Sequence, residues 1–176
     1  MSLAILLFYS SLKVMIQIDK SLIDSLFEKA KENPRLRQNY DMRTSNEDHS
    51  QQMLNALLPG TEVPIHRHPN SVENVLLLTG RMDEVLYEEV VEYTEDGDSR
   101  LIDVARKVAL REVKRIHLCP TEGKFGCQVP KGMWHTVEVF EPSVIFEAKD
   151  GKYGEDGSES FRLSEGCQRD RSVASA

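Results

Sequence analysis

Several features are scarce in this chain, and each scarcity excludes a class of protein. The three cysteines, Cys119, Cys127 and Cys167, form no CxxC pair and no even-numbered set. We therefore expect no disulfide scaffold and favour a reducing, cytoplasmic location. The apolar run at residues 4–8 is too short to span a bilayer and has no positive residue before it, as a signal peptide would. We accordingly expect no membrane partner.

Basic residues are not in excess either. The 22 Lys and Arg residues are outnumbered by 29 Asp and Glu residues, for a net charge of −7, and the two signs are mixed along the sequence. Nucleic acid is therefore not an expected partner, because phosphate contacts need clustered basic side chains. The length of 176 residues, with 40% hydrophobic and 29% charged residues, is typical of one globular domain.

We expect the folded domain to cover residues 15–153. Residues 1–14 are interpreted as an N-terminal extension, with an added edge strand as the alternative. The chain after residue 146 turns to Gly, Asp, Ser and Glu, so residues 154–176 are expected to form a poorly ordered C-terminal tail.

One helix is expected at the start of this domain. Residues 19–32 carry apolar side chains at the spacing of an amphipathic helix. Asp19 or Ser21 can cap its first turn, and Asn33-Pro34 is expected to end it.

Most of the remaining chain consists of short apolar segments separated by turn residues. This pattern indicates an all-β barrel or jelly roll. Residues 35–50 are expected to form a loop or short strand, residues 101–110 a short helix, and Asp96-Gly97-Asp98 a hairpin turn. Gly80 is expected to close the strand before it. The expected strands are 52–58, 75–79, 83–93, 113–119, 125–129, 134–140 and 143–148.

Two histidines and a glutamate stand at a spacing typical of a metal site. His66 and His68 alternate along a short strand and therefore share one face. A turn at Pro69-Asn70 would reverse the chain and place Glu73 on the next strand. The three side chains can then face the same point inside a barrel.

A third imidazole follows on a later strand. Pro130-x-Gly132 is a turn signal, and His135 is expected to face the barrel interior just after it. Three imidazoles and one carboxylate suit a single divalent transition metal from the set Zn, Fe, Mn, Ni, Co and Cu. An octahedral ion would keep two positions open for substrate or O₂. The predicted metal ligands are His66, His68, Glu73 and His135.

Other side chains near these motifs have simpler interpretations. His49 and His117 are expected to be ordinary surface or packing residues. Cys127 lies on a strand near the second motif and is a minor candidate for approaching the metal. Trp134 is expected to pack, because it points away from His135 along the strand.

The two motifs resemble those of the cupin superfamily. The first cupin motif, G(X)5HXH(X)3–4E(X)6G, is matched at every fixed position from Gly60 to Gly80. The second, G(X)5PXG(X)2H(X)3N, is matched at its Pro, second Gly and His, while Lys124 replaces the first Gly and Val139 the final Asn. The long spacing between the motifs implies an insertion near residues 90–110. The resemblance implies an all-β, single-domain cupin jelly roll with a short N-terminal helix.

A narrower resemblance is to the WbuC-type cupin metalloproteins, which occur in bacterial O-antigen gene contexts. It implies a fold and a metal but no settled reaction. The segments that carry it are residues 37–40, 52–57, 129–136 and 146–153.

This resemblance favours an enzyme of surface polysaccharide biosynthesis, for example a metal-dependent isomerase or epimerase. Its small-molecule substrate would be a sugar or nucleotide sugar. A non-haem metal oxygenase and a non-catalytic sugar-binding or sensing module are the alternatives. Tyr40 and Lys149 are weak catalytic candidates outside the ligand set. A homodimer is a further expectation, because cupins commonly dimerise and an edge strand here could pair across a two-fold axis.

Overall fold

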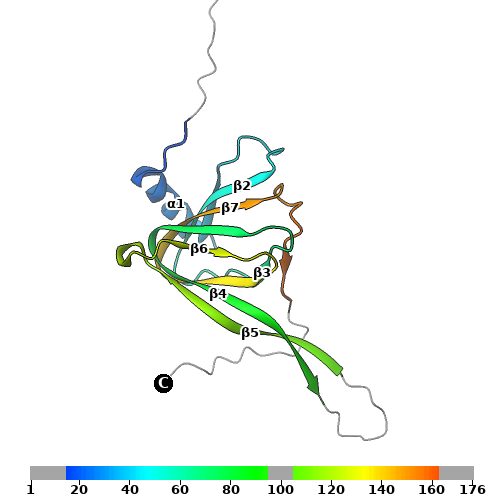
Figure 1. The fold of residues 1–176 in the computed structure, drawn as a ribbon. Coiled ribbons are helices and arrows are strands. Elements are labelled where there is room, and N and C mark those ends of the chain that lie inside the picture. The colour runs from blue at the N-terminus through cyan, green and yellow to red at the C-terminus, as the bar shows by residue number, and fades with distance from the viewer. Residues whose placement is uncertain (1–14, 95–104, 163–176) are drawn as a thin grey trace, which may run out of the picture.

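The structure, a computed structural model, describes residues 15–94 and 105–162. The interpreted extension at 1–14, the expected Asp96-Gly97-Asp98 turn and residues 163–176 of the expected tail lie outside this part of the chain. The described chain is a curled antiparallel sheet with one helix packed beside it (Figure 1). Its elements in order are α1 (Lys20–Glu32), β1 (Arg37–Asp41), β2 (Ser50–Leu57), β3 (His66–Arg67), β4 (Glu73–Thr94), β5 (Ala105–Leu118), the 3-10 turn η1 (Pro120–Glu122), β6 (Gly126–Val129), β7 (Trp134–Asp150) and β8 (Glu159–Ser160).

The fold class expected from the sequence is confirmed at the level of an all-β barrel with a short N-terminal helix. Strand β2 pairs with β7, β7 pairs with β3 and β4, and β4 also pairs with β5 and β6, all antiparallel. Because of this pairing the sheet curls into a barrel, and the side chains of the two histidine motifs point into its interior.

Helix α1 has the expected ends. Asp19 is the N-cap, and its side chain accepts a hydrogen bond from the Leu22 amide at 3.0 Å. Such a cap satisfies an amide that has no partner within the helix. Asn33 is the C-cap, and Pro34 then prevents continuation.

Strand β2 separates two hydrophobic clusters. On one face Leu54 and Ala56 pack against Leu26 and Ala30 of α1, in a cluster between helix and sheet. On the other face Leu57 belongs to a cluster inside the barrel. The alternation of β2 therefore builds two apolar layers, as expected for a strand covered on both sides. The inner cluster consists of Leu57, Val75, Leu77, Met82, Leu118 and Ile145.

The prediction that Gly80 closes a strand is wrong. Strand β4 runs through Gly80, and β7 likewise runs through the gap expected near residues 141–142. The ladder between them shifts register on both sides of Gly80. Gly80 has φ +96, and a Cβ there would lie 2.3 Å from Ser143 Oγ. The glycine thus permits a shared bend rather than a strand end, because only glycine fits this backbone and this close approach.

Beyond the barrel, β4 and β5 continue as a two-stranded ribbon (Figure 1). The pairing of β4 with β7 ends at Tyr87 opposite Trp134, whereas its pairing with β5 continues to Thr94 opposite Ala105. The ribbon occupies the region of the expected insertion. The helix predicted at 101–110 is wrong for residues 105–110, which belong to β5; residues 101–104 lie outside the described part. Pairing with β4 satisfies the backbone of this segment and overrides its helical spacing.

In residues 15–94 and 105–162, no helix has the length and apolar character that crossing a membrane would require.

Candidate metal centre

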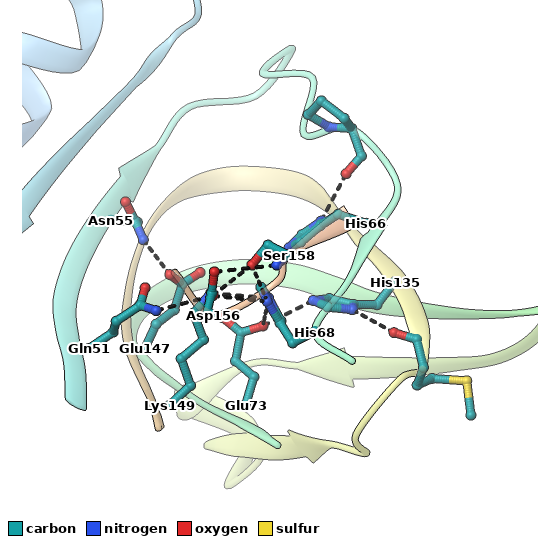
Figure 2. Close-up of polar contacts among 12 residues, drawn as sticks. Gln51, Asn55, His66, His68, Glu73, His135, Glu147, Lys149, Asp156 and Ser158 are labelled. Atoms are coloured by element: carbon teal, nitrogen blue, oxygen red, sulfur yellow. Dashed lines mark hydrogen bonds and ion pairs between the residues drawn. The ribbon is translucent and has the colours of Figure 1, made fainter. Parts of the chain in front are cut away.

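The four side chains predicted as metal ligands gather at one end of the barrel interior (Figure 2). His66 lies on β3 directly opposite His135 of β7, His68 follows β3, and Glu73 begins β4 after the predicted chain reversal. One nitrogen or oxygen atom from each of the four lies within 4.8 Å of the others. The turn at Pro130–Gly132 also contacts the first motif, since the Gly132 amide donates to the His68 carbonyl at 2.9 Å.

Glu73 is the central anion of this group. Its side chain is buried, and its Oε2 lies 3.0 Å from His135 Nε2 and 3.1 Å from His68 Nε2. Burial by itself would raise the pKa of Glu73. The close contacts of Glu73 Oε2 with the His135 and His68 rings, together with the charge of Lys149, outweigh burial and hold this pKa well below its usual range. Glu73 is therefore a carboxylate at neutral pH.

Two of the three imidazoles are oriented by nearby backbone. His66 Nδ1 lies 2.9 Å from the Pro64 carbonyl, and His135 Nδ1 lies 3.0 Å from the Met133 carbonyl. A carbonyl oxygen only accepts, so each Nδ1 carries the proton and donates it. Each Nε2 is then left with a lone pair.

The third imidazole is oriented by side chains far away in sequence. His68 Nδ1 lies 2.8 Å from Ser158 Oγ, and Ser158 Oγ donates to Asp156 Oδ2 at 2.6 Å. Burial opposes ionisation of Asp156, but hydrogen bonds from Ser158 and Gln51 and the charge of Lys149 lower its pKa to about 2. Because the hydroxyl proton goes to this carboxylate, Ser158 Oγ accepts from His68 Nδ1, and Nε2 again keeps its lone pair.

The donor set fits a metal ion. His68 and His135 turn Nε2 lone pairs toward a carboxylate oxygen at 3.1 and 3.0 Å, and a bound cation would stabilise this group of electron pairs. Burial, with a contribution from His135, lowers the pKa of His66 to about 4, so this imidazole is neutral at pH 7 as a ligand must be. Three imidazoles and one carboxylate suit a single divalent transition metal.

The structure separates the two weak catalytic candidates. Lys149 Nζ lies 3.2 Å from His68 Nε2 and 3.5 Å from Asp156 Oδ2, so this cation is beside the ligand group. Tyr40 instead packs against the apolar cluster that includes Leu26 of α1, on the other side of the sheet from the barrel interior.

The side chains given simpler interpretations lie outside the ligand group. Trp134 is buried and packs between Arg67, whose Cζ is 4.4 Å from the ring centroid, and Phe161. His117 is half-buried and its Nδ1 lies 2.8 Å from Asp83 Oδ1.

Cys127 packs against the inner cluster. Burial, with the charges of Glu84 and Glu73, raises the pKa of its thiol to about 12. A thiol this hard to ionise is a poor metal ligand.

Two further carboxyl groups in the barrel interior were not identified from the sequence. Burial, together with the charge of Glu73, raises the pKa of Glu147 to about 8, and Asn55 Nδ2 donates to Glu147 Oε2 at 2.7 Å. Glu84 is 1% exposed, and its Oε1 has no hydrogen-bond partner among the described residues. Burial, with the charges of Glu73 and Glu147, raises the pKa of Glu84 well above its usual range. Both glutamates lie within strands expected from the sequence, and no local pattern distinguishes them from the other glutamates there.

Asp156 and Ser158 were also missed, since they fall in the expected C-terminal tail. Residues 154–162 of that tail are placed against the barrel: Asp156 is 7% exposed and β8 pairs with β3. Ion pairing, hydrogen bonding and the packing of Phe161 on Trp134 hold this mostly polar segment. The Asp156-x-Ser158 spacing, typical of a local side-chain turn, was the available signal.

The curled antiparallel sheet and its His-His-Glu-His group define a β-barrel with a candidate metal centre. A family model described as "Domain of unknown function (DUF6016)" matches residues 18–97, which include α1 and three of the four ligand candidates. No curated protein matches the chain in sequence.

Several solved structures are similar to the chain at low sequence identity. Oxalate decarboxylase of Bacillus subtilis, described with Mn(II) centres, is 17% identical, with 70% of this chain and 27% of that chain covered and a TM-score of 0.42. An oxalate oxidase in complex with glycolate is 12% identical, with 73% and 56% covered and a TM-score of 0.44. The capsular polysaccharide assembling protein CapF of Staphylococcus aureus is 15% identical, with 71% and 31% covered and a TM-score of 0.43. The chain thus spans between about a quarter and just over half of these proteins' lengths.

Proposed function

We propose that this protein is a metal-dependent enzyme that acts on a small, oxygen-rich molecule such as a sugar or nucleotide sugar. The observation that carries the proposal is the convergence of three imidazoles and Glu73 beside a cation, Lys149, that is not itself a ligand. The residues that would hold the ion are His66, His68, Glu73 and His135.

The bound metal would supply a Lewis acid that polarises a substrate oxygen. Lys149 adds a positive charge next to this position, 3.2 Å from His68 Nε2. An ammonium group so placed attracts anionic substrate groups and stabilises negative charge that develops on oxygen. Lys149 is therefore proposed to orient the substrate.

Glu147 is the proposed proton-transfer group. A general acid or base works best when its pKa lies near the working pH, and the pKa of Glu147 is about 8 because of burial and the neighbouring Glu73 charge. Asn55 occupies Oε2 of Glu147, which leaves Oε1 to hold and transfer the proton. An isomerisation or epimerisation next to a carbonyl needs such a group.

Other parts of the proposal rest on sequence alone. They are the WbuC-type relationship, a role in bacterial O-antigen synthesis, a cytoplasmic location and a homodimeric state. The resemblance in residues 37–40, 52–57, 129–136 and 146–153 supports the first two, and the lack of a cysteine framework supports the third.

The test is a substrate panel of nucleotide sugars, assayed without oxygen on protein of known metal content. We expect turnover that disappears on metal removal and returns with the metal. Glu147→Gln should lower kcat by about 100-fold or more while the protein keeps its metal. Lys114→Gln, at an exposed position of β5, is the control and should leave kcat unchanged.

Two other outcomes would replace the proposal. Oxygen consumption that depends on Fe(II) and a candidate substrate would identify an oxygenase. Micromolar binding of a sugar with no turnover under either condition would identify a binding or sensing module.

A further inference from the structure

The C-terminal segment of the described chain is attached to the candidate metal centre by a set of polar contacts (Figure 2). Asp156 lies between three side chains of the barrel end. Its Oδ2 accepts from Gln51 Nε2 at 3.1 Å and lies 3.5 Å from Lys149 Nζ, and its carbonyl accepts from Asn70 Nδ2 at 3.2 Å. At 7% exposure, this carboxylate is part of the interior, not of a solvated tail.

The backbone of the segment is adapted to this position. Gly157 has φ +73, and a Cβ there would lie 2.7 Å from Asn70 Nδ2. The Ser158 amide donates to Asp156 Oδ1 at 3.3 Å. Next to this turn, β8 pairs with β3, and the Phe161 amide donates to the Ile65 carbonyl at 2.8 Å. Together these contacts fix the Ser158 hydroxyl at His68.

We propose that Ser158 and Asp156 are positioning residues that fix the ring orientation and tautomer of His68, and so set the metal affinity of the site from outside both histidine motifs. The inference rests on the proposed function in one respect, that the four gathered residues bind a metal. Its geometric part, the state of the His68 ring, does not depend on a metal.

The hydrogens available around His68 place the ring proton on Nδ1. The Asp156 carboxylate accepts from Ser158 Oγ at 2.6 Å, and the hydroxyl has a single hydrogen, so its oxygen is free to accept from His68 Nδ1 at 2.8 Å. Nδ1 therefore holds the ring proton, and Nε2 keeps a lone pair 3.1 Å from Glu73 Oε2. Lys149 Nζ lies 3.2 Å from Nε2 and 3.3 Å from Nδ1 and, as a donor only, can then bond Nε2 alone. Without this acceptor, the Nε2–H tautomer, which cannot bind a metal at that atom, becomes competitive because Glu73 would accept its hydrogen.

A second effect comes from charge. Lys149 Nζ lies 3.2 Å from His68 Nε2, where it opposes the approach of another cation. The Asp156 carboxylate, 3.5 Å from the same ammonium group, offsets that charge. Loss of Asp156 is thus expected to weaken metal binding through both the ring orientation and the uncompensated lysine.

The first experiment measures Zn(II) affinity by competition with a chelator at pH 7. Partners of a metal-bound imidazole typically change affinity about 10- to 100-fold. We expect Ser158→Ala and Asp156→Asn to bind Zn(II) about 10- to 100-fold more weakly than the wild type. Ser158→Thr, which keeps the hydroxyl, should stay within about threefold. Ser160→Ala, an exposed serine of the same segment, is the matched control and should not change the affinity.

The second experiment reads the imidazole tautomers of the metal-free protein by two-bond ¹H–¹⁵N NMR. All three rings should be in the Nδ1–H form in the wild type and in Ser158→Thr. In Ser158→Ala, His68 alone should gain Nε2–H character, while His66 and His135 stay unchanged. If Ser158→Ala acted only by loosening the fold, the tautomers of all three rings would change together or not at all.

The outcomes separate the two proposals. A wild-type protein that shows the expected tautomers but binds no metal would overturn the proposed function and leave the orientation of His68 established. A wild-type protein that binds Zn(II), with Ser158→Ala unchanged in both affinity and His68 tautomer, would overturn the positioning role alone.

Discussion

The imidazoles of the candidate centre are held in two different ways. His66 and His135 each donate from Nδ1 to a carbonyl two residues earlier in the chain. His68 instead donates to a side chain 90 residues later, on the segment that pairs with the barrel through β8. The two kinds of support serve the same purpose, since each leaves an Nε2 lone pair facing Glu73.

The two kinds of support need different amounts of the fold to be formed before they can orient a ring. A carbonyl two residues away is in place as soon as the local backbone forms, whatever side chain that residue carries. A distant hydroxyl is in place only after the chain has closed around the barrel. We infer that the His68 side of the site depends on tertiary structure, while the His66 and His135 side is largely built into the motifs.

The largest expected effect comes from removal of a locally held imidazole. His66→Ala or His135→Ala should weaken metal binding by more than about 100-fold, because a ligand matters more than the partners of a ligand. The stabilisation that the metal provides should be lost with it, since an ion that binds only the folded state raises the melting temperature. Elemental analysis and thermal unfolding with and without metal measure both. His49→Ala, at an exposed histidine, is the control, and unchanged metal content in both variants would remove the site assignment.

The next largest expected effect is on the pH dependence of stability. The metal-free protein should lose stability as the pH falls from about 6.5 to about 4. Unfolded His66 binds its proton near the ordinary pKa of about 6.5, whereas burial, with a contribution from His135, lowers the folded pKa to about 4. The unfolded chain thus binds more protons in this window, and His66 accounts for up to about 3 kcal/mol of the loss.

Urea unfolding of the metal-free wild type and of His66→Ala, at about pH 7 and about pH 4.5, measures this contribution. The wild type should lose more stability between the two pH values than the variant does. Equal losses would mean that His66 has an ordinary pKa in the folded protein. Metal binding should also weaken below about pH 6, where protons compete for imidazole lone pairs.

A smaller effect, of the opposite sign, is expected at the His68 side. Lys149→Met should bind metal about three- to tenfold more tightly, because the ammonium group 3.2 Å from His68 Nε2 both donates to the lone pair and repels a cation. Lys152→Met removes a lysine paired with Glu47 and Glu155 instead and should leave the affinity unchanged. Weaker binding by Lys149→Met would show that the lysine supports the site by offsetting its carboxylates.

The smallest expected effect tests the local support directly. Met133→Ala should change metal affinity by less than about threefold, because His135 Nδ1 uses the backbone carbonyl of residue 133 and not its side chain. The same chelator competition measures it. A tenfold loss would mean that the Met133 side chain itself orients His135. His135 and His68 would then both depend on a neighbouring side chain.

Sequence reasoning identified those parts of the molecule that local patterns determine. The ends of α1 followed from a capping Asp19 and from Asn33-Pro34. The gathering of His66, His68 and Glu73 followed from strand alternation and one predicted turn. These features involve contacts between residues close in sequence, which composition and spacing describe well.

Long-range pairing accounts for the errors. Gly80 has the local marks of a strand end, yet β4 continues because β7 bends with it at Ser143. Residues 105–110 have a helical spacing of apolar side chains, yet the partner strand β4 decides their structure. Asp156 and Ser158 lie in a stretch whose composition is typical of a poorly ordered tail, and their partners Gln51 and His68 are about 90 or more residues away in sequence.

The bend at Gly80 has a consequence for how this barrel can vary among related sequences. Glu73 stands at one end of β4, and the ribbon formed with β5 is the other end of the same strand. Because the bend and the β7 ladder fix β4 between these ends, residue pairs can be added to or removed from the ribbon without displacing Glu73. One continuous strand therefore holds a constrained half and a half that is free to change length, so the ribbon can acquire new surfaces while the metal ligands keep their places.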